Sequence, residues 1–306
     1  MKTVFLVNPA SANGSTGRRW PELARRAAAG GLEGDTLFSE RPGHLAELAR
    51  EAALGGAELL VVVGGDGSVN EVANGLVGLG GQPEVALVPR GTGWDFSRTF
   101  GIPRKIDEAV RVALEGDVRS IDLGRASYRA WDGSDATTAF ANVASTGMSG
   151  AIAKRANETT KALGGKLSYL WATFAVFSGW QASEVQLTVG GEQRAAKMFD
   201  VVVANGRFFG GGLQICPDAE ADDGLFDVLT IGDITKRDLV LTMPKIYRGT
   251  HLPHPKAEAL RGRVVTVETD ELVPVELDGE QPGTTPARFE VVPGALQLRV
   301  PAASPG

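Results

Sequence analysis

Residues 59–70 read Leu-Leu-Val-Val-Val-Gly-Gly-Asp-Gly-Ser-Val-Asn, and this stretch decides the fold of the chain. Residues 59–63 form a continuous apolar run, which is typical of a strand buried on both faces of a parallel sheet. A glycine-rich turn follows, and apolar residues then recur at helical spacing over residues 69–79. The stretch therefore predicts a buried strand, a tight turn and a helix whose first backbone N–H groups can stabilise an anion.

The first 125 residues repeat this alternation of strand and helix. Further strands are predicted at residues 3–7, 36–39, 85–88 and 118–123. Helices are predicted between them, at residues 20–29, 45–54 and 106–114. Alternation of this kind indicates an α/β domain in which helices cover both faces of a parallel sheet.

After about residue 125 strand-like segments dominate the chain. They lie at residues 138–143, 185–189, 199–204, 225–231, 264–268, 273–277 and 289–292. Helices are expected near residues 151–163, 168–177 and 236–248. We therefore predict two domains, an α/β domain over residues 1–125 and a β-rich, mainly antiparallel domain over residues 126–294.

The composition limits the classes of function. The 306 residues carry 31 Lys and Arg against 37 Asp and Glu, a net charge of −6 that disfavours a nucleic-acid partner. The one cysteine, Cys216, cannot form an intrachain disulfide, and with three histidines it cannot build the usual structural zinc sites. No signal peptide is expected, and the longest apolar stretch, residues 170–177, is shorter than the ~20 residues that span a bilayer. We expect a soluble protein of a reducing compartment.

Three loops are predicted at the carboxyl edge of the parallel sheet, where ligands bind in open α/β folds. They are residues 8–17, 64–70 and 89–96. Their glycines allow the backbone to approach a phosphate closely, although a plain turn capped by Asp66 is the alternative for the second loop. No Gly-x-Gly-x-x-Gly opens a helix here and no Gly-Lys-Ser/Thr P-loop is present, which disfavours a dinucleotide dehydrogenase and a P-loop ATPase.

Further motifs follow in order along the chain. After Gly64-Gly65-Asp66-Gly67 and Gly91-Thr92-x-x-Asp95-Phe96 come Asn205-Gly206-Arg207, Gly210-Gly211-Gly212, Asp222-Asp223-Gly224-Leu225 and Asp278-Gly279-Glu280. This ordered set resembles the bacterial lipid kinases of the diacylglycerol kinase and sphingosine kinase superfamily. The resemblance implies an N-terminal α/β domain like those of NAD kinases and phosphofructokinases, a β-sandwich-like C-terminal domain, and an active site between them. It also implies that a last strand, at about residues 295–301, returns to the first domain.

The resemblance assigns roles to particular residues. Glu280 corresponds to the catalytic base of similar enzymes, and Asp278 helps to orient it or to bind metal, whereas Asp-Gly-Glu taken alone is a common hairpin turn. The residues implied in ATP binding are Asn8, Ser39, Gly64, Gly65, Asp66, Gly67, Ser68, Val69, Asn70, Thr92 and Asp95.

Two Mg²⁺ sites are implied by the same resemblance. The ion that accompanies ATP is assigned to Asp66, Asp95, Thr92 and Asp122, and Asp122 also has the simpler interpretation of a residue at a strand end. A second, structural ion is assigned to the Asp223 side chain and the backbone carbonyls of Glu220 and Leu225, with a capped turn as the alternative. Oxygen ligands of these kinds suit Mg²⁺.

Two features are left open by the motifs. Trp94 stands where the family pattern usually has Asn. Its side chain has three alternative roles, which are packing in the core, stacking on a base and shaping the entrance for the lipid. Residues 234–263 carry seven basic residues against two acidic ones, an excess that suits either anionic lipid or solvent.

The resemblance implies an ATP-dependent, Mg²⁺-dependent kinase that phosphorylates the hydroxyl of diacylglycerol or a related lipid. It further implies a role in phospholipid biosynthesis, a cytoplasmic protein peripheral to the inner face of the membrane, and a homodimer. One alternative is a small-molecule kinase like NAD kinase, which the motifs of the second half disfavour. The other is a non-catalytic nucleotide-binding regulatory module, which the intact Asp66, Asp95, Asp278 and Glu280 disfavour.

Overall fold

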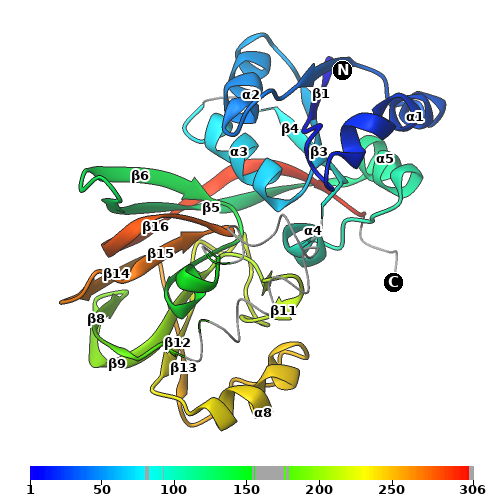
Figure 1. Ribbon diagram of the computed structural model, residues 1–306. Helices are drawn as coiled ribbons and strands as arrows, with labels where there is room; N and C mark the ends of the chain where they lie inside the picture. Colours follow the sequence, from blue (N-terminus) through cyan, green and yellow to red (C-terminus); the bar gives the residue numbers. More distant parts are fainter. Residues whose placement is uncertain (80–82, 92, 154, 156–175, 177–178, 303–306) are drawn as a thin grey trace. The chain divides into compact units, whose positions relative to one another are not determined.

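The computed structural model describes all residues except 80–82, 92, 154, 156–175, 177–178 and 303–306 (Figure 1). The chain divides into two compact units, one formed by Met1–Leu123 with Pro293–Gly306 and the other by Gly124–Val292. The chain leaves the first unit within strand β5 (Asp117–Ala130) and returns to it within strand β16 (Glu280–Val300). Among the residues that the structure describes, no helix combines the length and the apolar character needed to cross a bilayer.

The first unit contains a parallel sheet in the strand order β16-β4-β3-β1-β2. Its strands β1 to β4 are Thr3–Val7, Asp35–Phe38, Leu59–Gly64 and Glu84–Pro89. Every residue of β3 is buried, as its apolar run predicted, and so is every residue of β1. The end of β16 lies parallel to β4, with Gln297 opposite Glu84 and Leu298 opposite Val85.

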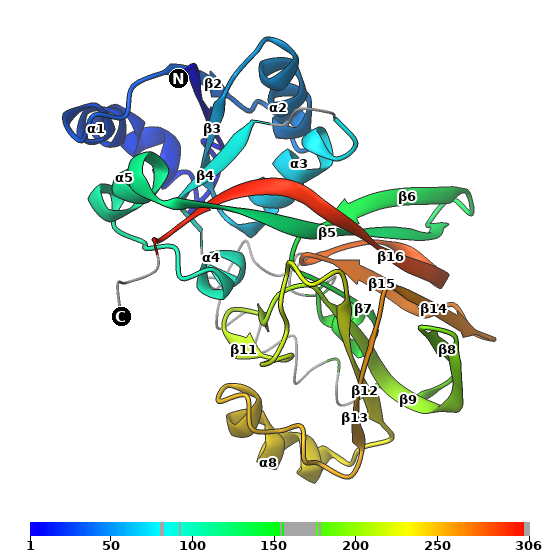
Figure 2. The ribbon, with the colours of Figure 1, turned by 180° about the vertical axis from the view of Figure 1, so that it is seen from behind.

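Helices cover both faces of this sheet. The helices of the unit are α1 (Ser15–Ala29), α2 (His44–Leu54), α3 (Asp66–Leu76), α4 (Asp95–Thr99) and α5 (Ile106–Glu115). Helices α1 and α5 pack on one face and α2 and α3 on the other (Figure 2). Since the strands are parallel, their carboxyl ends meet at one edge, where the turns into α3 and α4 begin.

The second unit is built from antiparallel strands. In chain order, β6 to β9 are Asp135–Phe140, Val143–Gly147, Ser183–Val189 and Glu192–Ala204, and β10 to β12 are Phe208–Phe209, Leu213–Gln214 and Phe226–Gly232. Helix α8 (Lys236–Ile246) follows, and β13 to β15 are Ala257–Gly262, Val264–Thr269 and Pro274–Leu277.

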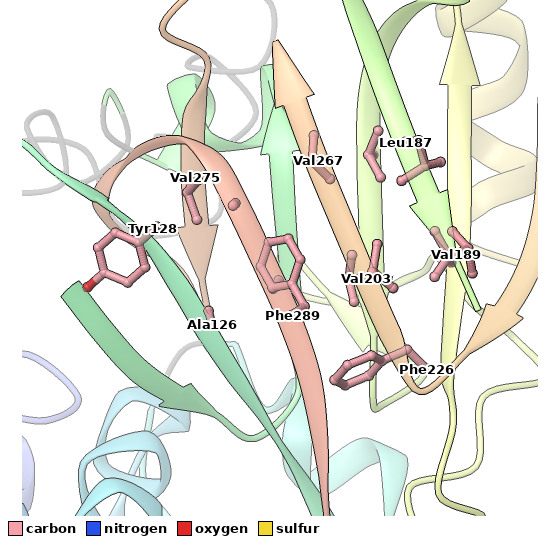
Figure 3. Packing of buried hydrophobic residues seen from close by; sticks show 14 of the residues in the cluster. Ala126, Tyr128, Leu187, Val189, Val203, Phe226, Val267, Val275 and Phe289 are labelled. Atoms are coloured by element: carbon pink, nitrogen blue, oxygen red, sulfur yellow. The ribbon is translucent and has the colours of Figure 1, made fainter. Parts of the chain in front are cut away.

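Six of these strands form a closed circuit of antiparallel pairs, β9-β7-β15-β16-β14-β8 and back to β9. The circuit encloses a buried core to which Phe140, Phe226 and Phe289 contribute. The ring of Phe140 stacks on Phe226 at 5.6 Å and meets Phe289 edge-on at 6.1 Å between centroids. Figure 3 shows Phe226, Phe289 and Val203 pointing into this interior from different strands. Closure leaves few open strand edges and gives the sandwich-like second domain.

Several predicted boundaries were wrong. The helix predicted from residue 20 begins at Ser15, so Ser15 to Gly17 are its first turn rather than a loop. The segments predicted at 289–292 and near 295–301 are parts of one strand, β16, because the chain continues without a break from one unit into the other. Helix α4 was not predicted, since five residues are too few to show a helical period. The helices expected near residues 151–163 and 168–177 lie largely outside the described residues.

Candidate functional site

The two glycine loops of the first unit lie against each other. Strand β3 ends at Gly64 and α3 begins at Asp66, so the first turn is as short as predicted. The backbone N–H of Arg90 donates to the carbonyl of Gly64 at 2.6 Å. A Cβ atom added to Gly91 would lie 2.8 Å from the Cα of Gly65, which is closer than real contacts allow. Glycine is therefore required here by the close approach of two backbones.

Asp66 ties the two loops together. Its carboxylate accepts hydrogen bonds from the backbone N–H groups of Trp94, at 2.9 Å, and Phe96, at 3.0 Å. Trp94 is the N-cap residue of α4, so the Asp66 side chain satisfies donors that the start of this short helix leaves unpaired. Gly93 leaves room for this carboxylate, because a Cβ there would lie 2.5 Å from Oδ2 of Asp66 and would displace it.

A small pocket with a cavity volume of about 10 Å³ lies between these loops. Its lining residues are Gly64, Gly65, Asp66, Val69, Leu87, Pro89, Arg90, Gly91, Trp94 and Ser97. Arg90 is the cation of this lining. Its Nε is buried without a hydrogen-bond partner, and Nη2 donates to the Ser15 hydroxyl at 3.4 Å. Burial, and then the charge of Arg19, lower the pKa of Arg90, so the pocket is a place where an added anion is stabilised.

The remaining residues predicted to bind nucleotide differ in their burial and in their contacts. Asn8 donates from Nδ2 to the hydroxyl of the buried Ser68 at 3.0 Å, which fastens the first loop to α3. Val69 is buried, Ser39 and Asn70 are half-buried, and Gly67 is exposed with open space around its Cα. Thr92 lies outside the described residues. Arg90 was missed from the sequence, where a single basic residue between Pro89 and Gly91 was the available signal.

The second unit holds the two residues predicted to be catalytic. Asp278 has a left-handed backbone, with φ of 50°. Its carboxylate accepts from the backbone N–H groups of Ala141 at 2.7 Å, Asn142 at 2.9 Å and Val143 at 3.0 Å. Glu280 is exposed at the start of β16, opposite Leu277. Asp278 therefore fastens the turn between β15 and β16 to the start of β7, and Glu280 emerges from that fastened turn.

A buried carboxyl lies beneath the same turn. Glu276 is 4% exposed, accepts from the Ser145 hydroxyl at 2.9 Å and from the backbone N–H of Gly279. Burial raises its pKa to about 8, and the charges of Asp278 and Asp200 act in the same direction. Asp200, 2% exposed and bonded to Ser149, has its pKa raised by burial to about 7. Sequence reasoning missed both carboxyls, since an acidic residue in a strand is ordinarily on the solvent face.

Two family models match the chain. Residues 2–126 match the diacylglycerol kinase catalytic domain, and residues 142–300 match the YegS C-terminal NAD kinase beta sandwich-like domain. A relative from Pseudomonas aeruginosa, named "Probable lipid kinase YegS-like", is 33% identical over 266 residues, which are 86% of this chain and 83% of the relative. The chain belongs to this family of bacterial lipid kinases. The fold class predicted from the sequence is confirmed.

Other relatives of the kinase carry a narrower name. A protein from Mycobacterium tuberculosis named diacylglycerol kinase is 29% identical over 302 residues, which are 98% of this chain and 95% of the relative. The crystal structure of a diacylglycerol kinase from Bacillus anthracis str. Sterne aligns with a TM-score of 0.73 at 24% identity and covers 98% of this chain and 96% of that one. That likeness shows the shared fold.

The carboxylates predicted to organise Mg²⁺ in the kinase are already engaged. Asp95 is buried and pairs with Arg98 at 2.7 Å, and Asp122 is buried and accepts from the Gly294 N–H at 2.8 Å. In the described part of the chain, no three His, Cys, Asp or Glu side chains are grouped to hold a metal. Mg²⁺ with a nucleotide usually needs one or two carboxylates, the phosphates and water, so Asp66 and Asp95 fit it in donor chemistry.

The residues predicted for the structural ion are also paired. Oδ1 of Asp223 accepts from the Leu225 N–H at 3.0 Å, and Oδ2 forms an ion pair with Arg261. Arg261 also lies 3.4 Å from Asp227. A guanidinium therefore already balances the acidic charge at this turn, and Mg²⁺ there would have to compete with it. Glu220 is exposed and Leu225 is half-buried.

Trp94 occupies a backbone conformation that would suit Asn, the residue that the resemblance implies at this position. Its φ of 68° is left-handed, which Asn tolerates far better than Trp. The ring lines the pocket, and its centroid lies 3.9 Å from the Arg104 guanidinium.

Trp94→Asn is expected to leave the kinase more stable than Trp94→Ala by about 1 kcal/mol, measured by urea unfolding, because Ala is strained at this φ. The control is the exposed Arg111 in helix α5, where Arg111→Ala should be more stable than Arg111→Asn because Ala has the higher helix propensity. Equal stabilities of the Ala and Asn variants at position 94 would contradict the role of backbone strain.

The buried carboxyls predict how stability depends on pH. Because the folded-state pKa values of Glu276 and Asp200 lie near 8 and 7, above those of unfolded carboxyls, the folded state binds extra protons. Their stabilising effect is complete below about pH 4 and is lost as the pH rises through 7 to 8. The urea concentration at the unfolding midpoint should therefore decrease as the pH is raised from 5.5 to 8.5. Glu276→Gln should flatten this fall, whereas Glu268→Gln, at an exposed site on β14, should not; an unchanged slope in Glu276→Gln would contradict the assignment.

Proposed function

We propose that this lipid kinase transfers the γ-phosphate of ATP to the hydroxyl of diacylglycerol or a closely related lipid. The observation that carries the proposal is the pocket between the glycine loops, where Asp66 joins the two turns and Arg90 places an uncompensated cation. Relatives named diacylglycerol kinase, aligned over nearly the whole chain, support the acceptor.

The first unit supplies the binding of phosphate. The backbone N–H groups at the start of α3 and the Arg90 guanidinium are the donors that hold the phosphate chain. Their positions are fixed before ATP arrives, since Asn8 holds Ser68 and Asp66 holds Trp94 and Phe96. The resemblance implies that Asp66, Asp95 and Asp122 would hold Mg²⁺, which would neutralise charge on the transferred phosphoryl group.

The second unit supplies the base. Glu280 accepts the proton of the lipid hydroxyl as that oxygen forms its bond to the γ-phosphorus and the bond to the β-phosphate oxygen of ATP breaks. An exposed carboxylate at a fastened turn suits this task, because it can reach a substrate while its backbone is held by Asp278. Asp278 in this account is a positioning residue, since its oxygens already accept three backbone N–H groups.

A panel of acceptors tests the substrate class. With labelled ATP and Mg²⁺, we expect label in a diacylglycerol presented in detergent micelles and none in NAD. Label in NAD alone would establish a small-molecule kinase instead. ATP binding without label in any acceptor would favour a regulatory nucleotide-binding module.

A further inference from the structure

Helix α8 presents an unusual face to solvent. Leu239 and Ile246 are buried at 7% exposure and anchor the helix to the second unit, with Met243 packed beside them. With 100° per residue, Arg237 and Leu241 point away from this buried stripe. The outward face therefore belongs to residues that no other described part of the unit covers.

This face gathers exposed apolar side chains. Nine large hydrophobic residues in the described part of the chain are exposed, and three of them, Val240, Leu241 and Tyr247, lie within eight consecutive residues at 55%, 60% and 51% exposure. The other six are scattered over the sequence: Met1, Phe38, Leu54, Val118, Trp131 and Leu272. Single exposed hydrophobic residues are ordinary, but a cluster on one helix face indicates a binding surface.

The same segment carries a local excess of positive charge. Lys236, Arg237, Lys245 and Arg248 stand against the one acid Asp238 in a protein of net charge −6. Asp238 is held in the capping box with Thr235, whose N–H and hydroxyl donate to it at 3.1 and 2.7 Å. None of the salt bridges formed among described residues uses Arg237, Lys245 or Arg248. These three cations are therefore available to an external anionic partner.

We propose that the outward face of α8 together with the two residues that follow the helix, defined as Arg237, Val240, Leu241, Lys245, Tyr247 and Arg248, docks this kinase onto an anionic phospholipid bilayer. Apolar residues flanked by cations and one Tyr are the composition of helices that lie in the membrane interface, with the apolar groups among the acyl chains and the cations at the phosphates. A nucleic acid would make favourable contacts with the cations but not with the apolar residues, and a purely apolar protein groove would do the reverse. The inference rests on the proposed function, since a kinase for a bilayer-dissolved lipid must reach that surface.

Vesicle co-sedimentation tests the surface without catalysis. The full chain should bind vesicles of phosphatidylcholine with 30 mol% phosphatidylglycerol far more tightly than vesicles of phosphatidylcholine alone, and salt should weaken the binding. At about fivefold per cation near an anionic surface, Arg237→Gln/Lys245→Gln/Arg248→Gln should weaken binding about 100-fold. The matched triple variant Arg25→Gln/Arg50→Gln/Arg111→Gln changes net charge equally in exposed cations of the first unit and should leave binding within about threefold of wild type.

The apolar half of the surface has its own test. Leu241→Ser should weaken binding about tenfold, whereas Leu272→Ser, at a more exposed leucine of the same unit, should not. Equal losses in the α8 variants and their controls would overturn the proposal, as would equal binding to neutral and anionic vesicles.

A soluble short-chain diacylglycerol separates this inference from the proposed function. If the α8 variants phosphorylate it at the wild-type rate but lose vesicle binding, both the docking surface and the kinase activity are supported. If vesicle binding falls as expected while no lipid is phosphorylated by any variant, the surface stands and the proposed function fails. If phosphorylation proceeds and α8 variants bind vesicles like wild type, the function stands and the docking surface is wrong.

Discussion

Glu280→Gln is expected to slow phosphate transfer to diacylglycerol by about 10²- to 10⁴-fold, because the amide cannot accept the hydroxyl proton during attack on phosphorus. The loss should fall on kcat, since Glu280 is proposed to act in the transition state and not to hold ATP. Because Glu280 is exposed, the variant should unfold at the same urea concentration as wild type. Rates under saturating ATP, measured beside ATP affinity and the unfolding midpoint, check all three expectations.

The matched control for Glu280 is Glu271→Gln. Glu271 is exposed in the same unit, nine residues earlier in the sequence, and the proposal gives its side chain no task. This variant should retain wild-type rates. A Glu280→Gln variant that keeps its activity would remove the base from the account, and one that loses ATP binding would move Glu280 to a binding role.

Asp278→Ala is expected to lower the free energy of unfolding of the second unit by about 3 kcal/mol or more. The substitution leaves three backbone N–H groups, those of Ala141, Asn142 and Val143, without their acceptor, and each lost bond of this kind costs about 1–3 kcal/mol. Ala also fits poorly at a φ of 50°. Urea unfolding followed by a probe in the second unit measures the loss, and Asp270→Ala, at an exposed acid eight residues earlier, should change little.

Asp278→Asn separates positioning from catalysis. One amide oxygen can still accept from Asn142 and Val143, and Asn tolerates the left-handed backbone, so only the bond from Ala141 is lost. The stability loss should shrink to about 1–2 kcal/mol, and the folded variant should keep most of its kcat. A variant that is folded but as slow as Glu280→Gln would show that the carboxylate charge itself takes part in the reaction.

Local patterns in the sequence predicted most strands and helices of the first unit. The apolar run of β3, the glycines after it and the helical spacing of α3 are each specified within a few residues, and the structure has all three, although α3 spans Asp66–Leu76 and not residues 69–79. The neighbouring strand β4 and its glycine loop follow in the same way. Parallel strands then necessarily bring both turns to one edge of the sheet.

The tertiary contacts that complete the site could not be predicted in the same way. The Asp66 carboxylate accepts hydrogen bonds from backbone N–H groups 28 and 30 residues away in the sequence. The three backbone N–H groups that donate to Asp278 lie more than 130 residues away in the sequence. A side chain bonded to distant backbone leaves no periodicity in the sequence. The turns that hold Asp66 and Asp278 were recognised, but what their carboxylates do was not.

The sequence also did not reveal which charged side chains are paired or buried. The resemblance implied a Mg²⁺ site at Asp223, whereas the structure places the Arg261 guanidinium against its carboxylate. Glu276 sits in a strand whose alternation of apolar and polar residues suggests exposure, yet both faces of β15 are covered and its carboxyl is buried. Burial of a residue on the second face of a strand depends on what packs there, and that is decided by the fold.

Transfer of phosphate from ATP to a lipid hydroxyl is the one reaction proposed for the pocket of the first unit and Glu280 of the second. Its most direct test is the transfer of ³²P from γ-labelled ATP to diacylglycerol in mixed micelles, run in parallel with wild type, Arg90→Gln and Glu280→Gln. We expect labelled phosphatidic acid from wild type, a raised KM for ATP in Arg90→Gln and a collapsed kcat in Glu280→Gln. No labelled lipid from a wild-type protein that binds ATP would contradict the account.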